Sequence, residues 1–324
     1  MVTKTSDQPI TIQNYYGMVL LVEAVATNPQ GDPGADNRPR QLPDGRGLIT
    51  ASGIKRKIRD MAKLDGEDIY VARSSCFEAT DKKVAGADYN KPEVVKILAK
   101  NFFDVRAFGQ LVARITTAVR GPVQFSNGIS LDPIEITEHS ITRCAVASEK
   151  ERDAREAAKT KALEKREEAL EKRDPKTEDL DDDESAESDA VLKTMGRSSF
   201  VTYGLYRFDI TVNPHDAFES GYTEEDHKKL ISIMLRMFQN DAASGRMLKI
   251  KKLHQFSMPM KNAAGKISYA PISNILDMVT FEKSEGDIST VMAPALESAI
   301  EAKRIVSEDL LKKALKDVLG DSGE

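Results

Sequence analysis

Apolar residues follow one another almost without interruption through "GMVLLVEAVATNP", which begins at Gly17. A run of this kind that ends in turn residues is typical of a strand buried on both faces or central in a sheet. Later in the chain, "YRFDITV" alternates strictly between apolar and polar positions, which predicts a second strand. Its apolar set is Tyr206, Phe208, Ile210 and Val212.

Two segments carry the apolar period of amphipathic helices. In "ITASGIKRKIRDMAKL", Ile54, Ile58 and Met61 recur at helical spacing, and a strongly basic face lies opposite them. In "TEEDHKKLISIMLRMFQN", Thr223 can cap a second helix. With a last strand in "RMLKIKKLHQF", the order strand, helix, strands, strand, helix, strand predicts an α+β fold of the ferredoxin-like or RNA-recognition (RRM) type.

Long insertions interrupt this order. Residues 65–103, with a helical pattern in "KPEVVKILAKNFF", predict an inserted subdomain, and the stretch from Asp104 to Arg143 predicts two or more strands. Residues 149–174 hold nine acidic and nine basic residues, which is typical of a solvated charged helix. The acidic run 175–189 that follows has too little apolar surface to fold.

Charge is unevenly distributed along the 324 residues. The formal net charge is -5, but residues 175–189 carry -7 and the tail 282–324 carries -4, which leaves +6 on the remainder. A mildly basic body permits a nucleic-acid partner without requiring one. No leader or membrane span is recognised, so we expect a cytoplasmic protein with no membrane partner. Cys76 and Cys144 lack metal-ligand spacing and are expected to be buried free thiols.

Signatures of enzymes are missing from the sequence. No phosphate-binding loop, dinucleotide fingerprint, zinc-protease or nucleophile-elbow motif occurs, so we predict no metal, no cofactor and no catalytic residue. Asp32, Asp36 and Asp44 lie in a loop rich in Gly and Pro. They could ligate a metal for phosphoryl cleavage, but turn-stabilising roles explain each of them.

The basic helical face is the sharper signal. Lys and Arg repeated every three to four residues match a row of phosphates, although a solvated surface helix has the same pattern. No aromatic run lies on an outer strand, which indicates contact with a nucleic-acid backbone instead of base reading.

Six motifs together resemble one known family. They are "NPQGDP", "ITASGIKRKIRD", "DVRAFGQ", "RGPVQFS", "SITR" and "MGRSSFVTYGLYR", in that order, within a match that runs from about Gly17 to Lys252. This set is similar to the crRNA-binding backbone subunit of type I-C (Dvulg subtype) CRISPR surveillance complexes, the "Cas seven" family of Cascade. The charged insertion 149–189 departs from that pattern, because it is much longer than a thumb loop needs.

The resemblance implies a domain plan. It predicts an RRM/ferredoxin-like palm, an inserted helical finger subdomain and a protruding thumb hairpin. The palm comprises 1–64, 104–138 and 200–258, the finger 65–103, and the thumb 139–199 with the insertion 149–189, whereas 259–324 has no assigned role.

The resemblance also implies RNA-binding residues. On the basic helix, Ser52, Lys55 and Arg56 contact the guide backbone, and Arg59 extends the same face. Met195 could wedge a base. The remaining candidates lie in the preceding loop, in "FGQ" and "GPVQF", and at the thumb base: Arg38, Arg40, Gln110, Gln124, Phe125, Arg143 and Arg197.

The implied function is a non-catalytic scaffold. Its partners are the crRNA, target DNA paired to the guide, further copies of the chain arranged head to tail in a helical filament, and other Cascade subunits. The alternative is a backbone subunit that cleaves target RNA through a metal-dependent loop aspartate, as similar subunits of type III complexes do.

Overall fold

The computed structural model describes residues 11–143, scattered positions between 149 and 164, and residues 194–242, 247–260, 272–284 and 287–319. The chain divides into two compact units. One consists of Met1–Ile136 with Phe200–Glu324, and the other is Thr137–Ser199. None of the helices in the described ranges is both long and apolar enough to cross a membrane.

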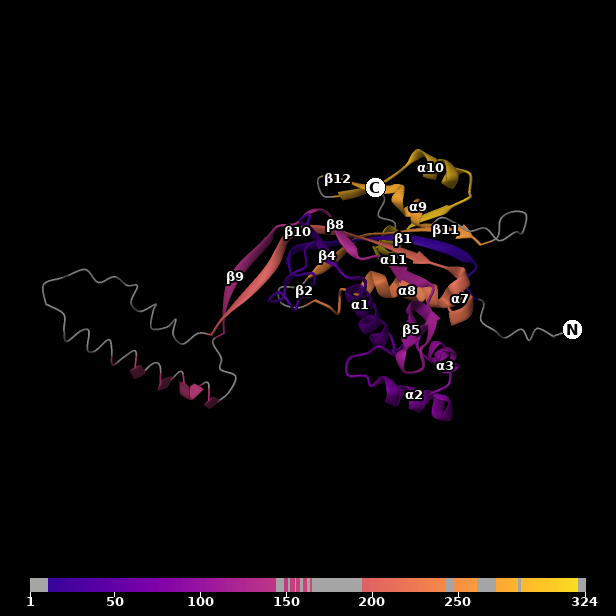
Figure 1. Cartoon of the computed structure of the whole chain (residues 1–324). Helices are drawn as coiled ribbons and strands as arrows, with labels where there is room; N and C mark the ends of the chain where they lie inside the picture. Colours follow the sequence, from indigo (N-terminus) through magenta and orange to yellow (C-terminus); the bar gives the residue numbers. More distant parts are fainter. Residues whose placement is uncertain are drawn as a thin grey trace. The chain divides into compact units, whose positions relative to one another are not determined.

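A central antiparallel sheet organises the first unit and makes the fold mixed α+β (Figure 1). Its order is β14-β11-β1-β10-β8-β4, and β7 also pairs with β10. Leu20 lies opposite Phe208 on one neighbour and Leu253 on the other, so the first apolar run is a central strand as predicted. The strands are β1 (Asn14–Thr27), β4 (Arg46–Ile49), β7 (Val123–Phe125), β8 (Gly128–Pro133), β10 (Thr194–Val212), β11 (Leu248–Pro259) and β14 (Val306–Asp309).

Helices α1 (Ala51–Leu64) and α8 (Glu224–Arg236) pack against one face of this sheet (Figure 1). Ile54 and Ile58 of α1 and Leu230 of α8 are fully buried there among the apolar side chains of β1 and β10. Thr223 caps α8 in a reciprocal capping box. Both helices predicted by the apolar period are therefore confirmed.

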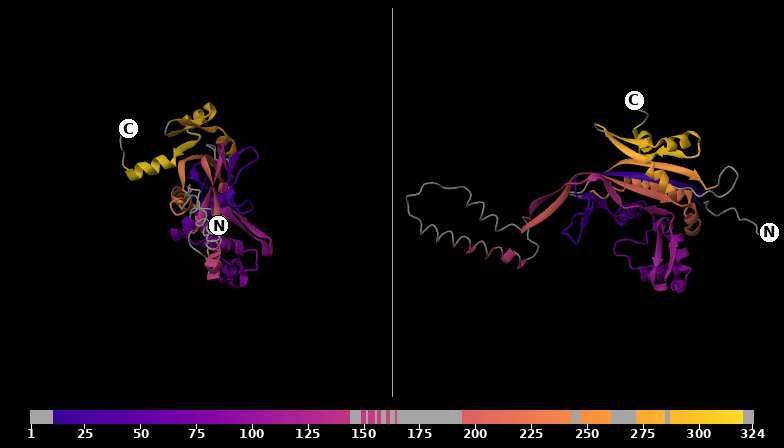
Figure 2. Two further views of the ribbon diagram at one scale, coloured as in Figure 1. Left: turned by 90° about the vertical axis from the view of Figure 1, so that its left-hand side faces the viewer. Right: turned by 45° about the horizontal axis from the view of Figure 1, so that its top comes forward.

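The C-terminal segment covers the second face of the sheet (Figure 2). Leu276 packs with Val19 and Phe256 in a second apolar cluster. Gly17 lies under this segment, since a Cβ there would stand 2.7 Å from Ile272 Cγ2. The sequence left this segment without a role, yet it closes a sheet face. Its elements are α9 (Ile272–Asp277), β12 (Val279–Ser284), β13 (Asp287–Met292) and α10 (Pro294–Glu301). Helix α11 (Leu310–Leu319) lies on the first face instead, where Leu310 packs in the same apolar cluster as α8.

The insertion after α1 has a small apolar core of its own, which contains Tyr70, Leu98 and Val119. The predicted helix in this region is confirmed as α3. The stretch from Asp104, predicted to form strands, begins instead within helix α4, whose Phe103 packs in the main core while Val105 packs in the small one. The elements are α2 (Phe77–Ala85), α3 (Val94–Asn101), α4 (Phe103–Phe108), β5 (Gly109–Val112) and β6 (Thr117–Arg120).

Smaller elements also belong to the first unit: β2 (Gly31–Asp32) and β3 (Arg38–Pro39) pair within the loop after β1, and α7 (Pro214–Ser220) follows β10. Cys76 is exposed, contrary to expectation, because it occupies the position that precedes the first turn of α2. Cys144 lies outside the described residues.

Within the second unit, β9 (Ile136–Arg143) pairs with the first part of β10 as a hairpin. Gly196 faces Ile141 across this hairpin, since a Cβ at Gly196 would stand 3.2 Å from Ile141 Cγ1. The predicted charged insertion 149–189 lies outside the described residues, apart from scattered helical positions between 149 and 164. Its folding therefore stays a prediction.

Candidate nucleic-acid interface

The start of helix α1 is fixed by hydrogen bonds from two loops. Thr50 caps the helix by accepting from the Gly53 N–H at 3.1 Å. Gln30 in the preceding loop accepts from the Thr50 N–H at 2.7 Å, and Asn127 Oδ1 accepts from the Ala51 N–H at 2.9 Å. The turn after β7 is thereby held against the first turn of α1, which brings Phe125 close to the basic face of the helix.

Lys55 is the central cation of this face. Its Nζ lies 5.1 Å from the ring centroid of Phe108 and 5.9 Å from that of Phe125. Burial, and secondly repulsion by Arg59, lower the pKa of Lys55 to about 8. In the part of the chain that the structure describes, no carboxylate pairs with this ammonium. Lys55 is therefore a partly desolvated positive charge that the described residues do not neutralise.

Ser52 and Arg56 flank Lys55 on the exposed side of α1. The Ser52 hydroxyl lies 3.0 Å from the Thr50 hydroxyl and faces solvent. The Arg56 side chain is 61% exposed and makes only a loose pair with Asp60, with Nε 3.8 Å from Oδ2. An exposed pair of this kind contributes little, so the guanidinium remains available to an anion. These three predicted residues do share one surface.

Two other basic residues of α1, Lys57 and Arg59, point into the protein. Arg59 Nε donates to Asp104 Oδ2 at 2.8 Å, and Asp104 is fully buried. Lys57 pairs with Asp241 below the ring of Phe238. Arg59 was predicted to extend the RNA-binding face. Its Nε serves an internal ion pair, and contact with RNA through its remaining N–H groups stays a prediction.

The predicted loop residues have turn and pairing roles. Asp32 Oδ1 accepts from the Gly34 N–H at 3.1 Å, and its Oδ2 pairs with Arg40 Nη1 at 3.3 Å. Asp36 adopts a left-handed φ of 49°, which Asp and Asn tolerate better than most residues. Arg38 is exposed on β3. The turn role expected for Asp32 is confirmed.

Asp44 has the same turn role, because its Oδ1 accepts from the Arg46 N–H at 3.0 Å. The Arg46 side chain also holds this carboxylate, and the two contacts lower the pKa of Asp44. Among the described residues, no group of three or more His, Cys, Asp or Glu side chains is arranged to hold a metal ion.

Of the three candidates from "FGQ" and "GPVQF", only Phe125 contacts Lys55. Gln110 Nε2 donates to the Leu111 carbonyl at 2.9 Å on β5. Gln124 Nε2 donates to the Gly121 carbonyl at 2.8 Å beside β7. Both amides therefore have local backbone partners.

Three candidates belong to the hairpin of the second unit. Arg197 is exposed on β10. Arg143 ends β9 and Met195 lies near the start of β10, but their side chains lie outside what the structure describes. Their contacts with RNA or with a neighbouring copy stay predictions.

Sequence reasoning missed Phe108 and Asp104 as parts of the site. Phe108 lies under two of the cations of α1, since the Arg59 guanidinium is 5.2 Å and Lys55 Nζ is 5.1 Å from its ring centroid. Asp104 also accepts from the Tyr70 N–H at 2.8 Å and the Val71 N–H at 3.1 Å. The available signal was an acid inside the apolar stretch "FFDVRAF".

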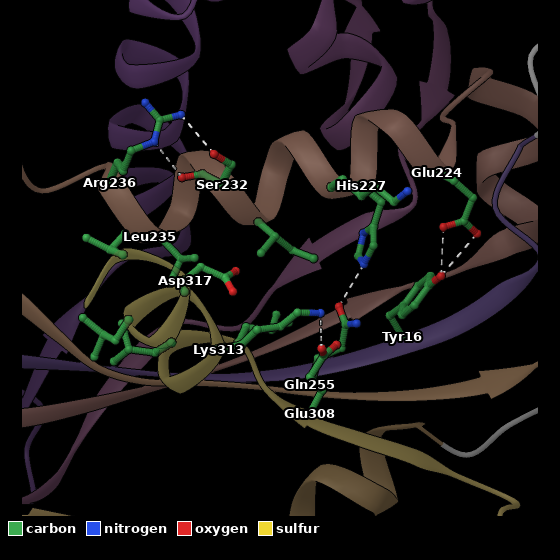
Figure 3. A pocket seen from close by; sticks show the side chains of 17 residues that line it. Tyr16, Glu224, His227, Ser232, Leu235, Arg236, Gln255, Glu308, Lys313 and Asp317 are labelled. Atoms are coloured by element: carbon green, nitrogen blue, oxygen red, sulfur yellow. Dashed lines mark hydrogen bonds and ion pairs between the residues drawn. The ribbon is translucent and has the colours of Figure 1, made fainter. Parts of the chain in front are cut away.

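A cleft of about 640 Å³ opens between α8 and α11 (Figure 3). At one end, the Tyr16 hydroxyl donates to Glu224 Oε2 at 3.0 Å, and His227 Nε2 lies 2.9 Å from Gln255 Oε1. Burial lowers the pKa of His227. Burial and, secondly, the negative charge of Glu224 raise the pKa of Tyr16 to about 12. Both rings are therefore neutral at pH 7. Lys55, Phe108 and Phe125 do not line this cleft.

The fold and the interface define a mixed α+β protein with a cationic helix face. A family model described as CRISPR-associated protein Cas7 matches residues 14–299. The chain therefore belongs to the CRISPR-associated protein Cas7 family. The membership agrees with the family that the six sequence motifs resembled.

The individual relatives match either a smaller part of the chain than the family model does, or most of the chain at low sequence identity. A CRISPR-associated protein Cas7 from Haloferax volcanii is 32% identical over 168 residues, which cover 43% of this chain and 49% of that protein. The match thus spans about half the length of the relative.

Two solved structures are also similar. A chain of a "CRISPR RNA-guided surveillance complex, pre-nicking" is 14% identical with a TM-score of 0.41, covering 95% of this chain and 90% of that one. A chain of a "CRISPR RNA-guided surveillance complex" is 13% identical with a TM-score of 0.36, covering 94% and 86%.

Proposed function

We propose that this chain is a non-catalytic backbone subunit that holds the guide RNA of a CRISPR surveillance complex, of the type I-C class that its motifs resemble. The observation that carries the proposal is Lys55, a half-buried ammonium without a carboxylate partner in the described chain. Ser52 and Arg56 flank it on the same helix face. A cation left unpaired in this way is suited to a phosphate of the RNA backbone.

The arrangement of elements supports an RRM-like palm. Along the chain, β1, α1, β8, β10, α8 and β11 follow the split βαβ order, and in the sheet β11, β1, β10 and β8 are neighbours. RRM domains stack bases on the open face of their sheet. Here Leu276 and its neighbours cover that second face. RNA is therefore expected along the exposed side of α1, where backbone contact dominates.

In this proposal the insertion 65–103 is the finger and the hairpin 139–199 is the thumb. The palm comprises 1–64, 104–138 and 200–258, and the C-terminal segment is 259–324. The partners are a crRNA, target DNA that pairs with it, further copies joined head to tail, and other Cascade subunits, in the cytoplasm. The predicted contacts of Arg38, Arg40, Gln110, Arg143 and Arg197 belong to the same proposal.

The alternative is metal-dependent cleavage of target RNA by a loop aspartate. The two oxygens of Asp32 are occupied by the Gly34 N–H and by Arg40, which does not favour a metal-binding role for that carboxylate. The scaffold function is preferred on this ground, and a cleavage assay described below distinguishes the two.

The direct test of the proposal has two parts. Nucleic acid that copurifies with the chain should be RNA of repeat and spacer sequence. Binding titrations at several salt concentrations should give lower affinity for Lys55→Ala and Arg56→Ala with every RNA sequence. Each lost phosphate contact should flatten the salt slope by about 0.7. Lys312→Ala, an exposed site on α11, removes the same charge and should change neither. Unchanged affinity and slope in both interface variants would refute the assignment.

A further inference from the structure

Lys55 occupies an unusual place for a lysine that has no acidic partner among the described residues. Its stem leaves α1 and its ammonium lies near the rings of Phe108 on α4 and Phe125 on β7. The two rings meet edge to face, with centroids 6.1 Å apart. Cation–π contacts stabilise an ammonium, but they contribute less than the hydration free energy that the ammonium loses on burial. The site therefore holds its positive charge at a cost in free energy.

The charged groups on the elements around Lys55 do not compensate that cost. Arg59, one turn along the same helix, adds a second positive charge. Asp104 of α4 is occupied by Arg59 and by two backbone N–H groups.

The remaining charged side chains nearby are paired elsewhere. Arg106 of α4 forms a bidentate pair with Asp226, at 2.9 and 3.3 Å. On β10, which pairs with β7, Arg207 and Asp209 pair with each other at 2.9 Å. None of these acids is available to Lys55, so an anion that binds this ammonium would come from outside the described part of the chain.

We propose that binding of an RNA phosphate at Lys55 is coupled to protonation of its side chain, with at most one proton taken up per subunit. The phosphate supplies the negative charge that the Phe108 and Phe125 site lacks. The proton comes from solvent and remains on Lys55 Nζ, and no covalent bond of the RNA changes. This inference rests on the proposed function, because it assigns the guide backbone to this face of α1.

The size of the effect follows from the titration of the free chain. With its pKa lowered to about 8, Lys55 is neutral in about three quarters of the molecules at pH 8.5 and in about a tenth at pH 7. A bound phosphate favours the charged form and raises the pKa again. Each subunit should then take up about 0.7 proton at pH 8.5 and about 0.1 at pH 7, and its affinity should fall about threefold between pH 7.5 and pH 8.5.

The experiment is calorimetric titration of the full chain with a short oligocytidine RNA, whose bases do not titrate in the pH range used. Repeating each titration in buffers of different ionisation enthalpy gives the number of protons taken up. The comparison includes wild type, Lys55→Arg, whose guanidinium stays charged throughout, and Lys55→Met, which has no titrating group. Arg56→Ala serves as a control that weakens binding while leaving Lys55 in place.

Wild type and Arg56→Ala should show the proton uptake at pH 8.5, whereas Lys55→Arg and Lys55→Met should show none. Tight binding by wild type with no uptake and no loss of affinity at pH 8.5 overturns the coupling and leaves the proposed function intact. Uptake that persists in Lys55→Met overturns it too, because another group then titrates. Absence of RNA binding at pH 7 overturns both the coupling and the function on which it rests.

Discussion

Arg59 Nε lies 2.8 Å from Asp104 Oδ2, and this one ion pair fastens helix α1 to helix α4. The Asp104 side chain is fully buried and the Arg59 side chain is 15% exposed. The same carboxylate holds the backbone at Tyr70 and Val71, where the chain enters the insertion. The pair thus sets the position of Phe108, the ring over which Lys55 lies, relative to the basic face of α1.

Asp104→Ala should lower the free energy of unfolding by about 3–5 kcal/mol, since it leaves a buried guanidinium without a partner. Urea unfolding followed by circular dichroism measures the change. Asp44→Ala, which breaks the exposed pair with Arg46, should lower the free energy of unfolding much less. The double variant Arg59→Met, Asp104→Leu should recover only the part of the loss that comes from the unpaired guanidinium, because the Tyr70 and Val71 N–H groups still lack their acceptor. A loss for Asp104→Ala no larger than that for Asp44→Ala contradicts the anchoring role.

The elements that the sequence predicted correctly are those whose apolar pattern repeats over many residues. The alternation in β10 and the helical spacing of Ile54, Ile58 and Met61 each specify a buried face without knowledge of the partner. Which charged side chains of α1 stay exposed could not be predicted in the same way. Periodicity gives the direction of Arg59 but does not reveal that Asp104 stands opposite it.

The C-terminal cover was missed for a related reason. Its elements are short, such as the six-residue α9, and short apolar runs do not distinguish a core segment from a surface one. The cover becomes evident only when Leu276 is found against Val19 and Phe256. Among the predicted residues outside α1 whose side chains the structure describes, Phe125 alone contacts Lys55, because the turn at Asn127 is hydrogen-bonded to the start of that helix.

Leu276→Ala should destabilise the protein by about 2–5 kcal/mol, because the side chain is 1% exposed and its removal leaves a cavity under the C-terminal cover. Met278→Ala, at a site 38% exposed, should cost less than about 1 kcal/mol. Thermal or urea unfolding compares the two. Equal and small effects would mean that the C-terminal segment does not belong to the core.

Asp36→Ala should leave target RNA intact, as should wild type, if the chain is a scaffold. The test incubates the assembled complex with complementary RNA and magnesium or manganese, and separates the products on a denaturing gel. Asp44→Ala is the matched control in the same loop. Regularly spaced cuts that disappear only in Asp36→Ala would establish the cleavage alternative and reject the scaffold function.

Removal of residues 149–189 should leave folding of the remaining chain nearly unchanged, because the segment has almost no apolar residues to contribute to a core. A short Gly/Ser linker from Ser148 to Ala190 replaces it. The midpoint of thermal unfolding should stay within about 2 °C of the intact chain. Loss of soluble protein would indicate that the charged segment packs against the fold.

The number of subunits bound should rise in regular steps with guide length. A binding face that contacts backbone instead of reading bases can be occupied at every register of the strand, so each added copy gains the same phosphate contacts through Lys55 and Arg56. A thumb that docks on a different surface of the next copy makes a head-to-tail interface, and such interfaces generate open arrays. Native mass spectrometry on complexes reconstituted with guides of graded length gives the stoichiometry. Arg56→Ala should weaken every added step equally, whereas a fixed stoichiometry or a closed dimer without RNA would rule out the filament.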